Sequence, residues 1–567
     1  MRARTALRSW CLAQKPGRCG EGLCPKPRRG RKTLRETSRK MTHMVIYQIY
    51  PRSFQDSNDD GIGDLPGIIA RLGHIKSLSV DMIWISPVFK SPMRDFGYDV
   101  SDYRSVDPVF GTLADLRRLV DEARQLGMGV MLDMVVSHTS DQHPWFEASR
   151  RREEGKEDWY LWADALPDGA PPNNWLSVFG GDAWNWDATR RQYYFHTFLD
   201  SQPDLNFHHP AVQQQVLDEM RYWLEFGVAG FRFDACNHYF QDPLLRSNPP
   251  APGAHTHALH PYGFQQHLYD KNRPEVPPFL ARVRELLDRY GAYSVAEVGG
   301  SDAIQLAIDY VAPGRLHSAY SFDLLRTTHS ATYVRGVLER LATDLPGPGA
   351  PCHALSNHDK PRVATRWGAG REPSAVARQM LALLACLKGT ICLYQGEELG
   401  LPEAEVPFER LQDPYGRRFW PKFKGRDGCR TPLPWDTAPH GGFSSAEPWL
   451  PLAPTHVALN VAAQDADPDS VLNFARRAFA LRRERPALHA GDIAFDTDSA
   501  DDNARGLLRF ERHAPGSALV CLFNLGEEAL AVSAPPADRI LLSGAVRRTA
   551  TQALLEPNGF MIAELVR

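Results

Sequence analysis

The sequence predicts an α/β protein built on a closed parallel (β/α)8 barrel, the TIM-barrel architecture, and three observations point to it. Short apolar runs alternate with amphipathic helical patterns along most of the chain. Eight such units can be recognised, the number that closes a parallel barrel with its helices outside. Acids that look buried follow several of the runs, at the strand ends where such barrels carry their chemistry.

Taken in order, the apolar runs define eight predicted strands. They cover residues 45–50, 82–86, 130–136, 230–234, 293–297, 319–322, 352–355 and 390–394. Patterns of helical period separate them, most clearly at 113–126, 212–226, 278–290 and 375–387. We therefore expect residues 41–140 and 211–490 to form the barrel.

Two segments do not follow this alternation. Residues 141–210 are rich in Trp, Asn, Gly and Pro and are too long for a loop without structure of its own, so we expect a small domain inserted after the third strand. Residues 491–567 contain alternating strand-like runs, which predict a C-terminal antiparallel β domain.

The first 40 residues differ in composition from the rest of the chain. They are rich in Lys and Arg, contain only the acids Glu21 and Glu36, and lack an apolar run of the length that a secretory signal needs. We expect a disordered leader or a mis-assigned start, with the folded chain opening at Met41 or Met44. A transit peptide for an organelle is the alternative.

Composition narrows the class of protein. With 43% apolar and 23% charged residues, the chain of 567 residues is ordinary for a globular protein, and no stretch reaches the ~20 apolar residues of a membrane helix. The nine cysteines show no metal-ligand spacing, which fits a cytoplasmic protein. The basic leader conceals an acidic remainder, so neither nucleic acid nor a membrane is an expected partner. The choice between monomer and homodimer stays open.

The most informative strand is 230–234, where two charges lie inside an apolar run. Arg232 and Asp234 are two residues apart, so they share one face of the strand. Burying two charges costs several kcal/mol per ion unless they are paired, so they form either a structural salt bridge or part of a site. Glu297 and Asp359 favour a site, because each also ends a short apolar run and all three acids would meet at one mouth of the barrel.

Three acids at one mouth suit glycoside hydrolysis, in which one carboxylate attacks the anomeric carbon and another protonates the leaving oxygen. Retaining enzymes hold these two groups ~5–5.5 Å apart so that a covalent glycosyl intermediate can form. Arg232 is expected to keep Asp234 ionised, whereas a less compensated site would hold Glu297 protonated. Spacing alone does not settle which acid takes which role.

An acidic loop near the N-terminus predicts a cation site. Asp56, Asn58, Asp60 and Asp64 offer oxygens at positions 1, 3, 5 and 9 of the loop, with Gly61 at position 6 for a sharp turn. Ca²⁺ or Mg²⁺ prefers such ligands, and the ion would stabilise a loop rather than react. The loop departs from an EF-hand, whose bidentate Glu at position 12 is here Gly67, and a solvated acidic turn is the alternative.

Together the motifs resemble those of the α-amylase superfamily, glycoside hydrolase family 13, and within it the α-glucosidase and oligo-1,6-glucosidase branch. The resemblance extends from Val45 to the C-terminus. Six motifs carry it, at 133–138 (DMVVSH), 202–206 (QPDLN), 230–234 (GFRFD), 296–298 (AEV), 356–359 (SNHD) and 425–432 (GRDGCRTP).

The resemblance implies roles for the residues of the site. Asp234 is similar to the family's nucleophile, Glu297 to its general acid/base, and Asp359 to the acid that stabilises the oxocarbenium-like transition state. Further matches concern the first sugar subsite and the cation. His138, Arg232 and His358 would hold the glucosyl ring, and Tyr98 would stack beneath it. Asp99 and Arg430 would close the pocket for exo-action, and Phe179 would line the entrance. Ile62 would add a carbonyl to the structural Ca²⁺ or Mg²⁺ site. No organic cofactor is implied, the inserted segment would be domain B, and the β domain would be domain C.

The residues associated with linkage specificity in this family point in different directions. The form of 202–206 is that of oligo-1,6-glucosidases, but Ala235 after the nucleophile accompanies α-1,4 action in this branch. Residues 237–276 resemble the long loop of α-glucosidases restricted to short substrates. We therefore expect a maltose-like donor, with water or a small alcohol or phenol as acceptor.

Two other functions are alternatives. An oligo-1,6-glucosidase or a sucrose-active isomerase is the alternative within the family, although 324–329 lacks the Arg/Asp-rich motif associated with sucrose isomerases. A binding protein that kept the barrel but lost its chemistry is the alternative outside enzymes, and the presence of all three acids argues against it.

Overall fold

The computed structural model describes residues 43–565, except 254–258, 301, 346–348, 369, 496–499, 534–535 and 550. The predicted leader, 1–40, lies outside the described residues. Eight parallel strands close into a barrel in the order β1-β13-β12-β11-β10-β9-β5-β2. The predicted barrel is thereby confirmed.

Each predicted strand appears within a few residues of its expected position. The barrel strands are β1 (Val45–Ile49), β2 (Met82–Ile85), β5 (Gly129–Met134), β9 (Gly230–Phe233), β10 (Tyr293–Val298), β11 (Ser318–Ser321), β12 (Ala350–Ala354) and β13 (Thr390–Tyr394). The helices of the barrel region are α2 (Leu65–Ala70), α3 (Leu72–Ser77), α4 (Leu113–Gln125), α6 (Pro210–Phe226), α7 (Val276–Tyr290), α8 (Ala303–Tyr310), α9 (Ala331–Thr343), α10 (Val363–Arg366), α11 (Pro373–Cys386), α12 (Pro414–Phe419), α13 (Pro454–Ala458), α14 (Val461–Ala466), α15 (Val471–Glu484) and α16 (Pro486–Ala490).

Local sequence signals explain where the longer helices begin and end. A capping box starts α4, because the Thr112 side chain accepts from the Asp115 N–H and the Asp115 carboxylate accepts from the Thr112 N–H. Helix α6 begins with Pro210 at its first position and ends at Gly227, whose φ of 101° is left-handed. Such caps satisfy the orphan polar groups of helix ends and set the helix lengths around the barrel.

The barrel interior is layered by the alternation of side chains along each strand. An apolar layer that includes Ile46, Met131 and Val295 fills its lower part. Two residues further along their strands, Asp133 and Glu297 replace the apolar side chains, since residues two apart share a face. The charged layer therefore lies at the C-terminal ends of the strands, on top of a packed apolar floor.

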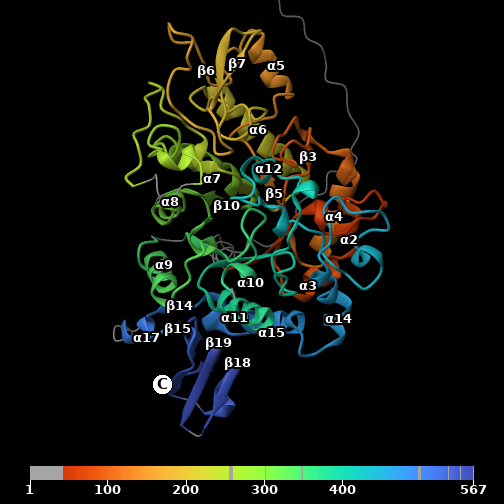
Figure 1. The fold of residues 1–567 in the computed structure, drawn as a ribbon, viewed down its shortest axis with the longest axis vertical. Helices are drawn as coiled ribbons and strands as arrows, with labels where there is room; N and C mark the ends of the chain where they lie inside the picture. Colours follow the sequence, from red (N-terminus) through yellow and green to blue (C-terminus); the bar gives the residue numbers. More distant parts are fainter. Residues whose placement is uncertain are drawn as a thin grey trace, which may run out of the picture.

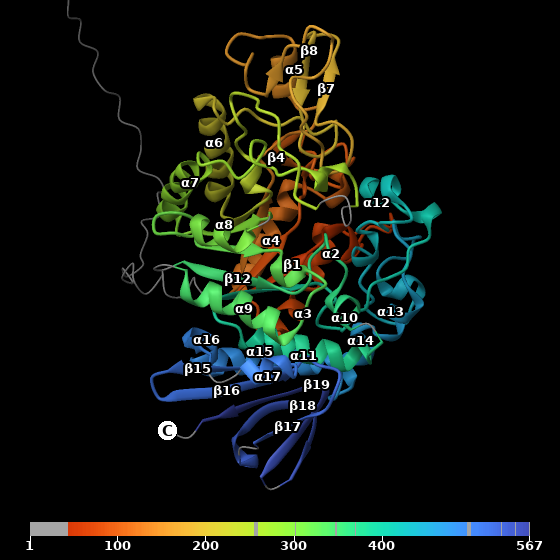
Figure 2. The ribbon, with the colours of Figure 1, turned by 60° about the vertical axis from the view of Figure 1, so that its left-hand side comes forward.

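Two smaller sheets lie at opposite ends of the long axis of the molecule (Figures 1 and 2). One is formed between β5 and α6 by β6 (Trp162–Ala163), β7 (Trp184–Asp187) and β8 (Gln192–Phe195), beside α5 (Pro144–Arg150). The other is the antiparallel sheet of β14 (Asp492–Ala494), β15 (Leu507–Ala514), β16 (Ser517–Asn524), β17 (Leu530–Ser533), β18 (Ile540–Arg548) and β19 (Gln552–Glu564), with α17 (Ala500–Ala504) beside it. A C-terminal antiparallel sheet is confirmed, while the exact domain limits stay predictions.

One short hairpin-like pair was not predicted. Strands β3 (Phe89–Lys90) and β4 (Asp102–Val106) pair antiparallel after β2, with a register shift between Phe89 and Lys90. The segment between these two strands carries Asp95, Tyr98 and Asp99. It therefore brings polar side chains from the second βα connection to the mouth of the barrel.

Candidate active site

Arg232 is the centre of the charged layer. Its guanidinium is fully buried: Nη1 lies 2.8 Å from Asp133 Oδ1 and 2.6 Å from Asp234 Oδ1, and Nη2 lies 2.6 Å from Glu297 Oε1. The strand register explains the arrangement, because Arg232 is paired with Asp133 on β5 and with Val295 on β10, two residues before Glu297. Arg232 and Asp234 do form the predicted pair, but one guanidinium serves three carboxylates.

This excess of carboxylates changes their protonation. Burial raises the pKa of Asp133 to about 6 and those of Asp234 and Glu297 to about 7, although Arg232 acts in the opposite direction on each. Arg232 acts to keep Asp234 ionised, as expected from the sequence, but burial and the charge of Asp133 act against it. The three carboxyl groups therefore keep at least one proton near neutral pH. A reaction that needs one acid and one base requires such a proton.

Glu297 is oriented by two further donors. The Tyr320 hydroxyl donates to Glu297 Oε1 at 3.0 Å, and the Ala235 N–H donates to Oε2 at 3.2 Å. Tyr320 lies directly beside Glu297 in the register of β10 and β11. Ala235 has a φ of 42°, an uncommon left-handed conformation for a non-glycine residue. The turn after Asp234 thus aims a backbone donor at the second acid.

Asp359 lies in a different electrostatic setting. Its Oδ1 is 2.9 Å from Arg430 Nη2 and 3.4 Å from Arg426 Nη1. Burial acts to raise the pKa of Asp359, but the charged groups around it hold that pKa well below its usual range. Because burial keeps the neighbouring His358 neutral, the two arginines supply those charges. Asp359 is accordingly ionised, whereas Asp234 and Glu297 are poised near neutrality.

A neutral, hydrogen-bonded wall stands beside the acids. The Tyr98 hydroxyl lies 2.6 Å from His358 Nε2 and 3.1 Å from Asp133 Oδ2, and the two rings are parallel with centroids 5.4 Å apart. His138 Nε2 lies 2.8 Å from the carbonyl oxygen of Tyr98. Burial lowers the pKa of both histidines, so they act here as neutral hydrogen-bonding groups. The predicted residues Tyr98, His138 and His358 are therefore brought together.

The predicted partnership of Asp99 with Arg430 is not formed. Asp99 is fully buried and accepts hydrogen bonds from the Ser91 hydroxyl and from the N–H groups of Arg94 and Asp95. Arg430 instead donates to Asp359 and to the carbonyl oxygen of His358. Asp99 therefore shapes the loop after β3 rather than contacting the pocket.

A different pair lies across the pocket. Arg426 Nη2 is 2.8 Å from Asp95 Oδ1 and 2.8 Å from Asp413 Oδ1, and both Asp95 and Arg426 line the cavity. Asp95 stands three residues before Tyr98, and Arg426 stands four before Arg430 inside a motif that the sequence analysis had singled out. The pairing could not be read from spacing, because both candidate acids lie in the same loop and both arginines in the same motif.

A cavity of about 470 Å³ opens above the acids. Asp234, Glu297 and Asp359 line it together with Tyr98 and His138, whereas Arg232, Asp99 and Arg430 are fully buried and are not among its lining residues. The volume lies in the range of pockets for small ligands. The loop 237–276 contributes His238, Leu259, Tyr262 and Lys271 to the lining.

The entrance is narrowed by aromatic rings from three distant segments. Phe179 stacks on Tyr415 with ring centroids 4.9 Å apart, which places the predicted entrance residue at the cavity. His260 stacks on Phe419 at 4.5 Å and lies 3.1 Å from the Tyr415 hydroxyl. The inserted segment, the loop 237–276 and the region of α12 are thus packed against one another around the mouth.

The predicted cation loop is held together by its own backbone. Asp56 accepts from the N–H groups of Asn58, Asp59 and Gly61 and from the Ser444 hydroxyl, and Asp60 accepts from the Ile62 N–H. Asp64 accepts from Ser57 and Gly67. Within the part of the chain that the structure describes, no three acidic, His or Cys side chains are gathered as metal ligands. These bonds leave further lone pairs on the carboxylates, so the Ca²⁺ or Mg²⁺ site at this loop stays a prediction.

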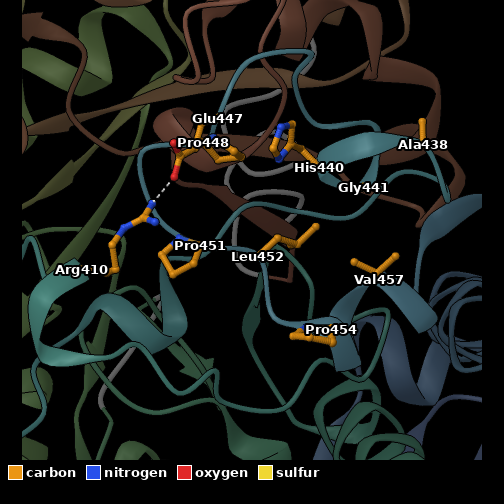
Figure 3. Close-up of a pocket in the computed structure, with 10 residues that line it drawn as sticks. All are labelled: Arg410, Ala438, His440, Gly441, Glu447, Pro448, Pro451, Leu452, Pro454 and Val457. Atoms are coloured by element: carbon orange, nitrogen blue, oxygen red, sulfur yellow. Dashed lines mark ion pairs between the residues drawn. The ribbon is translucent and has the colours of Figure 1, made fainter.

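A second hollow, of about 690 Å³, lies apart from the acids. Pro448, Pro451, Leu452, Pro454 and Val457 line much of it, and an ion pair of 2.9 Å between Arg410 and Glu447 closes one side (Figure 3). None of the three acids lines this hollow.

Of the helices in the described ranges, none combines the length and apolar character needed to cross a membrane.

The barrel and its acid cluster define the class of this protein. The catalytic domain of the alpha-amylase family matches residues 48–491. The chain therefore belongs to the alpha-amylase family, glycoside hydrolase family 13, and is a glycosidase. The family resemblance seen in the sequence is confirmed.

Individual relatives narrow this class. A probable alpha-glucosidase of Rhizobium meliloti (strain 1021) is 52% identical over 505 residues, covering 87% of this chain and 90% of that protein. An oligo-1,6-glucosidase of Parageobacillus thermoglucosidasius is 36% identical over 519 residues, covering 85% and 90%.

Solved structures show the same fold over nearly the whole chain. The alpha-glucosyl transfer enzyme XgtA superposes with a TM-score of 0.86 at 50% identity, covering 92% of this chain and 98% of that one. The trehalulose synthase MutB from Pseudomonas mesoacidophila MX-45 has a TM-score of 0.83 at 29% identity, covering 94% and 100%. The relatives thus include both hydrolytic and glucosyl-transferring enzymes by name.

Proposed function

We propose that this protein is a retaining, exo-acting α-glucosidase that removes the terminal α-1,4-linked glucose of maltose-like substrates. The observation that carries the proposal is the guanidinium of Arg232, which holds both Asp234 and Glu297 at the base of a narrow cavity. Two carboxyl groups held by one cation, with raised pKa values, suit a nucleophile and a general acid that divide one proton between them.

The proposed reaction begins with the glucosyl ring against Tyr98. Asp234 attacks the anomeric carbon while Glu297 donates its proton to the leaving oxygen, which gives a covalent glucosyl intermediate on Asp234. Asp359, ionised by its two arginines, would face the positive charge that develops on the sugar ring. Glu297, now a base, then removes a proton from the acceptor, which attacks the same carbon and releases Asp234.

The acceptor decides between hydrolysis and transfer. Water gives glucose, whereas an alcohol or phenol seated at Glu297 gives a new α-glucoside by the same second step. The aromatic mouth formed by Phe179, Tyr415 and Phe419 favours organic acceptors over bulk water, because it narrows solvent access. The name of XgtA, an alpha-glucosyl transfer enzyme, supports this part of the proposal.

Exo-action and short substrates are supported by the shape of the site. The Asp95–Arg426 pair closes the glucosyl end, so a longer chain has no route past the terminal unit. Ala235, which lines the cavity next to the nucleophile, supports α-1,4 rather than α-1,6 action by the family resemblance. The relatives named oligo-1,6-glucosidase make α-1,6 action the second candidate.

A time course with purified enzyme tests the proposal. Maltose, isomaltose, sucrose and maltotriose would be compared, following free glucose and new glucosides together, with NMR of the anomer formed first. We expect α-glucose as the first product and maltose as the best donor. β-Glucose as the first product would contradict the retaining mechanism, and isomaltose as the best donor would favour the second candidate.

A further inference from the structure

Two lysine side chains line the active-site cavity without an acidic partner. Lys271 comes from the loop 237–276 and Lys360 directly follows Asp359. Among the described residues neither forms an ion pair with a carboxylate, whereas Lys388 and Lys424 on the surface do. The proposed reaction with a neutral sugar uses neither ammonium group.

Lys271 is held in place by neutral groups. Its Nζ donates to the Tyr262 hydroxyl at 2.8 Å and lies 5.0 Å from the centre of the Tyr262 ring. The preceding residue, Asp270, lies 2.6 Å from His267 and forms no direct ion pair with Lys271, although its charge acts on that ammonium group. Burial lowers the pKa of Lys271 by more than the charge of Asp270 raises it, which reflects the cost of burying an ammonium in this wall.

Lys360 lies on the neighbouring wall. Its Nζ is 5.3 Å from the centre of the Phe322 ring, and both residues line the cavity. Among the groups that act on its charge are the carboxylates of Asp359 and Glu297. Asp359 is already bound by Arg426 and Arg430, and Glu297 by Arg232, so their charges are largely engaged.

Both lysines belong to the side where the leaving group must lie. Glu297, as proton donor, defines that side, and Gly299 follows it in the cavity wall, next to the Phe322 ring over which Lys360 lies. Asn237 ties the lysine-bearing loop to this point, because its Nδ2 donates to Asn272 Oδ1 at 2.7 Å and to the carbonyl oxygen of Gly299 at 2.8 Å. The glucosyl side, by contrast, is lined by Tyr98 and the neutral His138 and His358.

We propose that the aglycone side of this cavity recognises an anionic group, a carboxylate or a phosphate, on the leaving group or the acceptor. The inference rests on the proposed α-glucosidase function and names its substrate class. An oxyanion there would lie between the ammonium groups of Lys271 and Lys360 and form charge-assisted hydrogen bonds that a neutral sugar cannot form. Binding would also compensate the desolvated charges.

Matched pairs of substrates test the proposal. Donors would be maltose and maltobionate, which differ by a carboxylate at the former reducing end. Acceptors would be glycerol, glycerate and glycerol phosphate, with maltose as donor. We expect kcat/KM to favour the anionic member of each pair by about tenfold or more, as one or two charge-assisted hydrogen bonds imply. The ranking of glycerate against glycerol phosphate identifies which oxyanion is recognised.

Variants locate the effect. Lys360→Gln and Lys271→Gln should each lower the anionic-to-neutral ratio, and the double variant should bring it close to one. Lys360→Arg should retain much of the ratio because it keeps the charge. Lys424→Gln is the control, since Lys424 pairs with Glu405 outside the cavity and its loss should leave the ratio unchanged.

The outcomes separate the two proposals. A wild-type ratio of one or below, or a ratio that the double variant does not change, would overturn the anionic site while turnover of maltose upholds the glucosidase. No turnover of maltose or of any other neutral α-glucoside by the folded enzyme would overturn the proposed function itself. Folding of each variant would be checked by its thermal transition.

Discussion

The two sides of the cavity are built in different ways. On the side of the reacting acids, Asp133, Arg232 and Glu297 project from adjacent strands of the barrel, and the register between those strands fixes their contacts. On the aglycone side the lining residues come from loops, such as Tyr262 and Tyr415, which are 153 positions apart in number but lie around the same cavity.

The difference teaches where chemistry and selectivity reside in this molecule. A strand-built cluster cannot shift without disturbing a closed barrel, so it holds the reacting groups at constant geometry. Loops held by contacts such as that between His260 and Tyr415 can vary while the barrel stays the same. Changes on the strand side should therefore abolish catalysis, and changes on the loop side should redirect it.

The largest effect is expected from Asp234→Asn, on the strand-built side. The substitution removes the nucleophile at almost constant volume, so turnover should fall by several powers of ten, at least 10³-fold. Arg232 keeps Asp133 and Glu297 as partners, so the substitution leaves no unpaired buried cation and the fold should survive. Initial rates on maltose measure the loss of turnover, and the thermal transition serves as the control for folding. Near-normal turnover in a folded variant would contradict the role of Asp234 as nucleophile.

A second large effect is expected from Glu297→Gln, and it depends on the leaving group. Maltose needs a proton on its leaving oxygen, so its turnover should fall by about 10²–10⁴-fold, whereas an activated aryl glucoside needs none and should lose much less in the first step. Equal losses on both substrates would contradict the acid role.

The same residue predicts a pH dependence. Because burial raises the pKa of Glu297 to about 7, the acid is protonated below that pH and loses its proton above it. Maltose turnover should therefore fall as the pH rises through about 7. In Glu297→Gln this alkaline limb should disappear from the profile for the aryl glucoside, and its persistence would assign the limb to another group.

Much of the strand side could be predicted from the sequence. Period-two patterning places Arg232 and Asp234 on one face, and closure of eight parallel units brings Glu297 and Asp359 to the same mouth. What the pattern could not give is that Asp133 competes for the same guanidinium, because that contact depends on which strands are neighbours and in what register.

The loop side was predicted less well, for a physical reason. Asp99 and Asp95 stand in one turn, and which of them faces Arg426 depends on backbone conformation that has no periodic signal. Tyr415 and Lys271 reach the cavity through contacts between segments distant in sequence, and no local pattern marks them.

An intermediate effect is expected from Asp95→Asn, at the boundary between the two sides. It removes the charge of the carboxylate that pairs with Arg426, and the guanidinium keeps Asp413 as a partner but is held less firmly. The KM for maltose should rise by about 10- to 100-fold with a smaller change in kcat. Asp99→Asn is the matched control, because that carboxylate holds only its own loop and should alter stability rather than KM.

The smallest effect is expected from Ala235→Val, on the loop side of the nucleophile. Ala235 has a φ of 42°, where a β-branched side chain is strained, so the variant should lose on the order of 1 kcal/mol of stability. Its side chain lines the cavity, and the added methyl groups should lower the ratio of maltose to isomaltose turnover by a few-fold. Ala235→Gly separates the two contributions, because glycine relieves the backbone strain while adding no bulk. A ratio that changes equally in both variants would trace to the turn and its N–H bond to Glu297, whereas a change confined to Val would place linkage selectivity in the shape of the loop-built side.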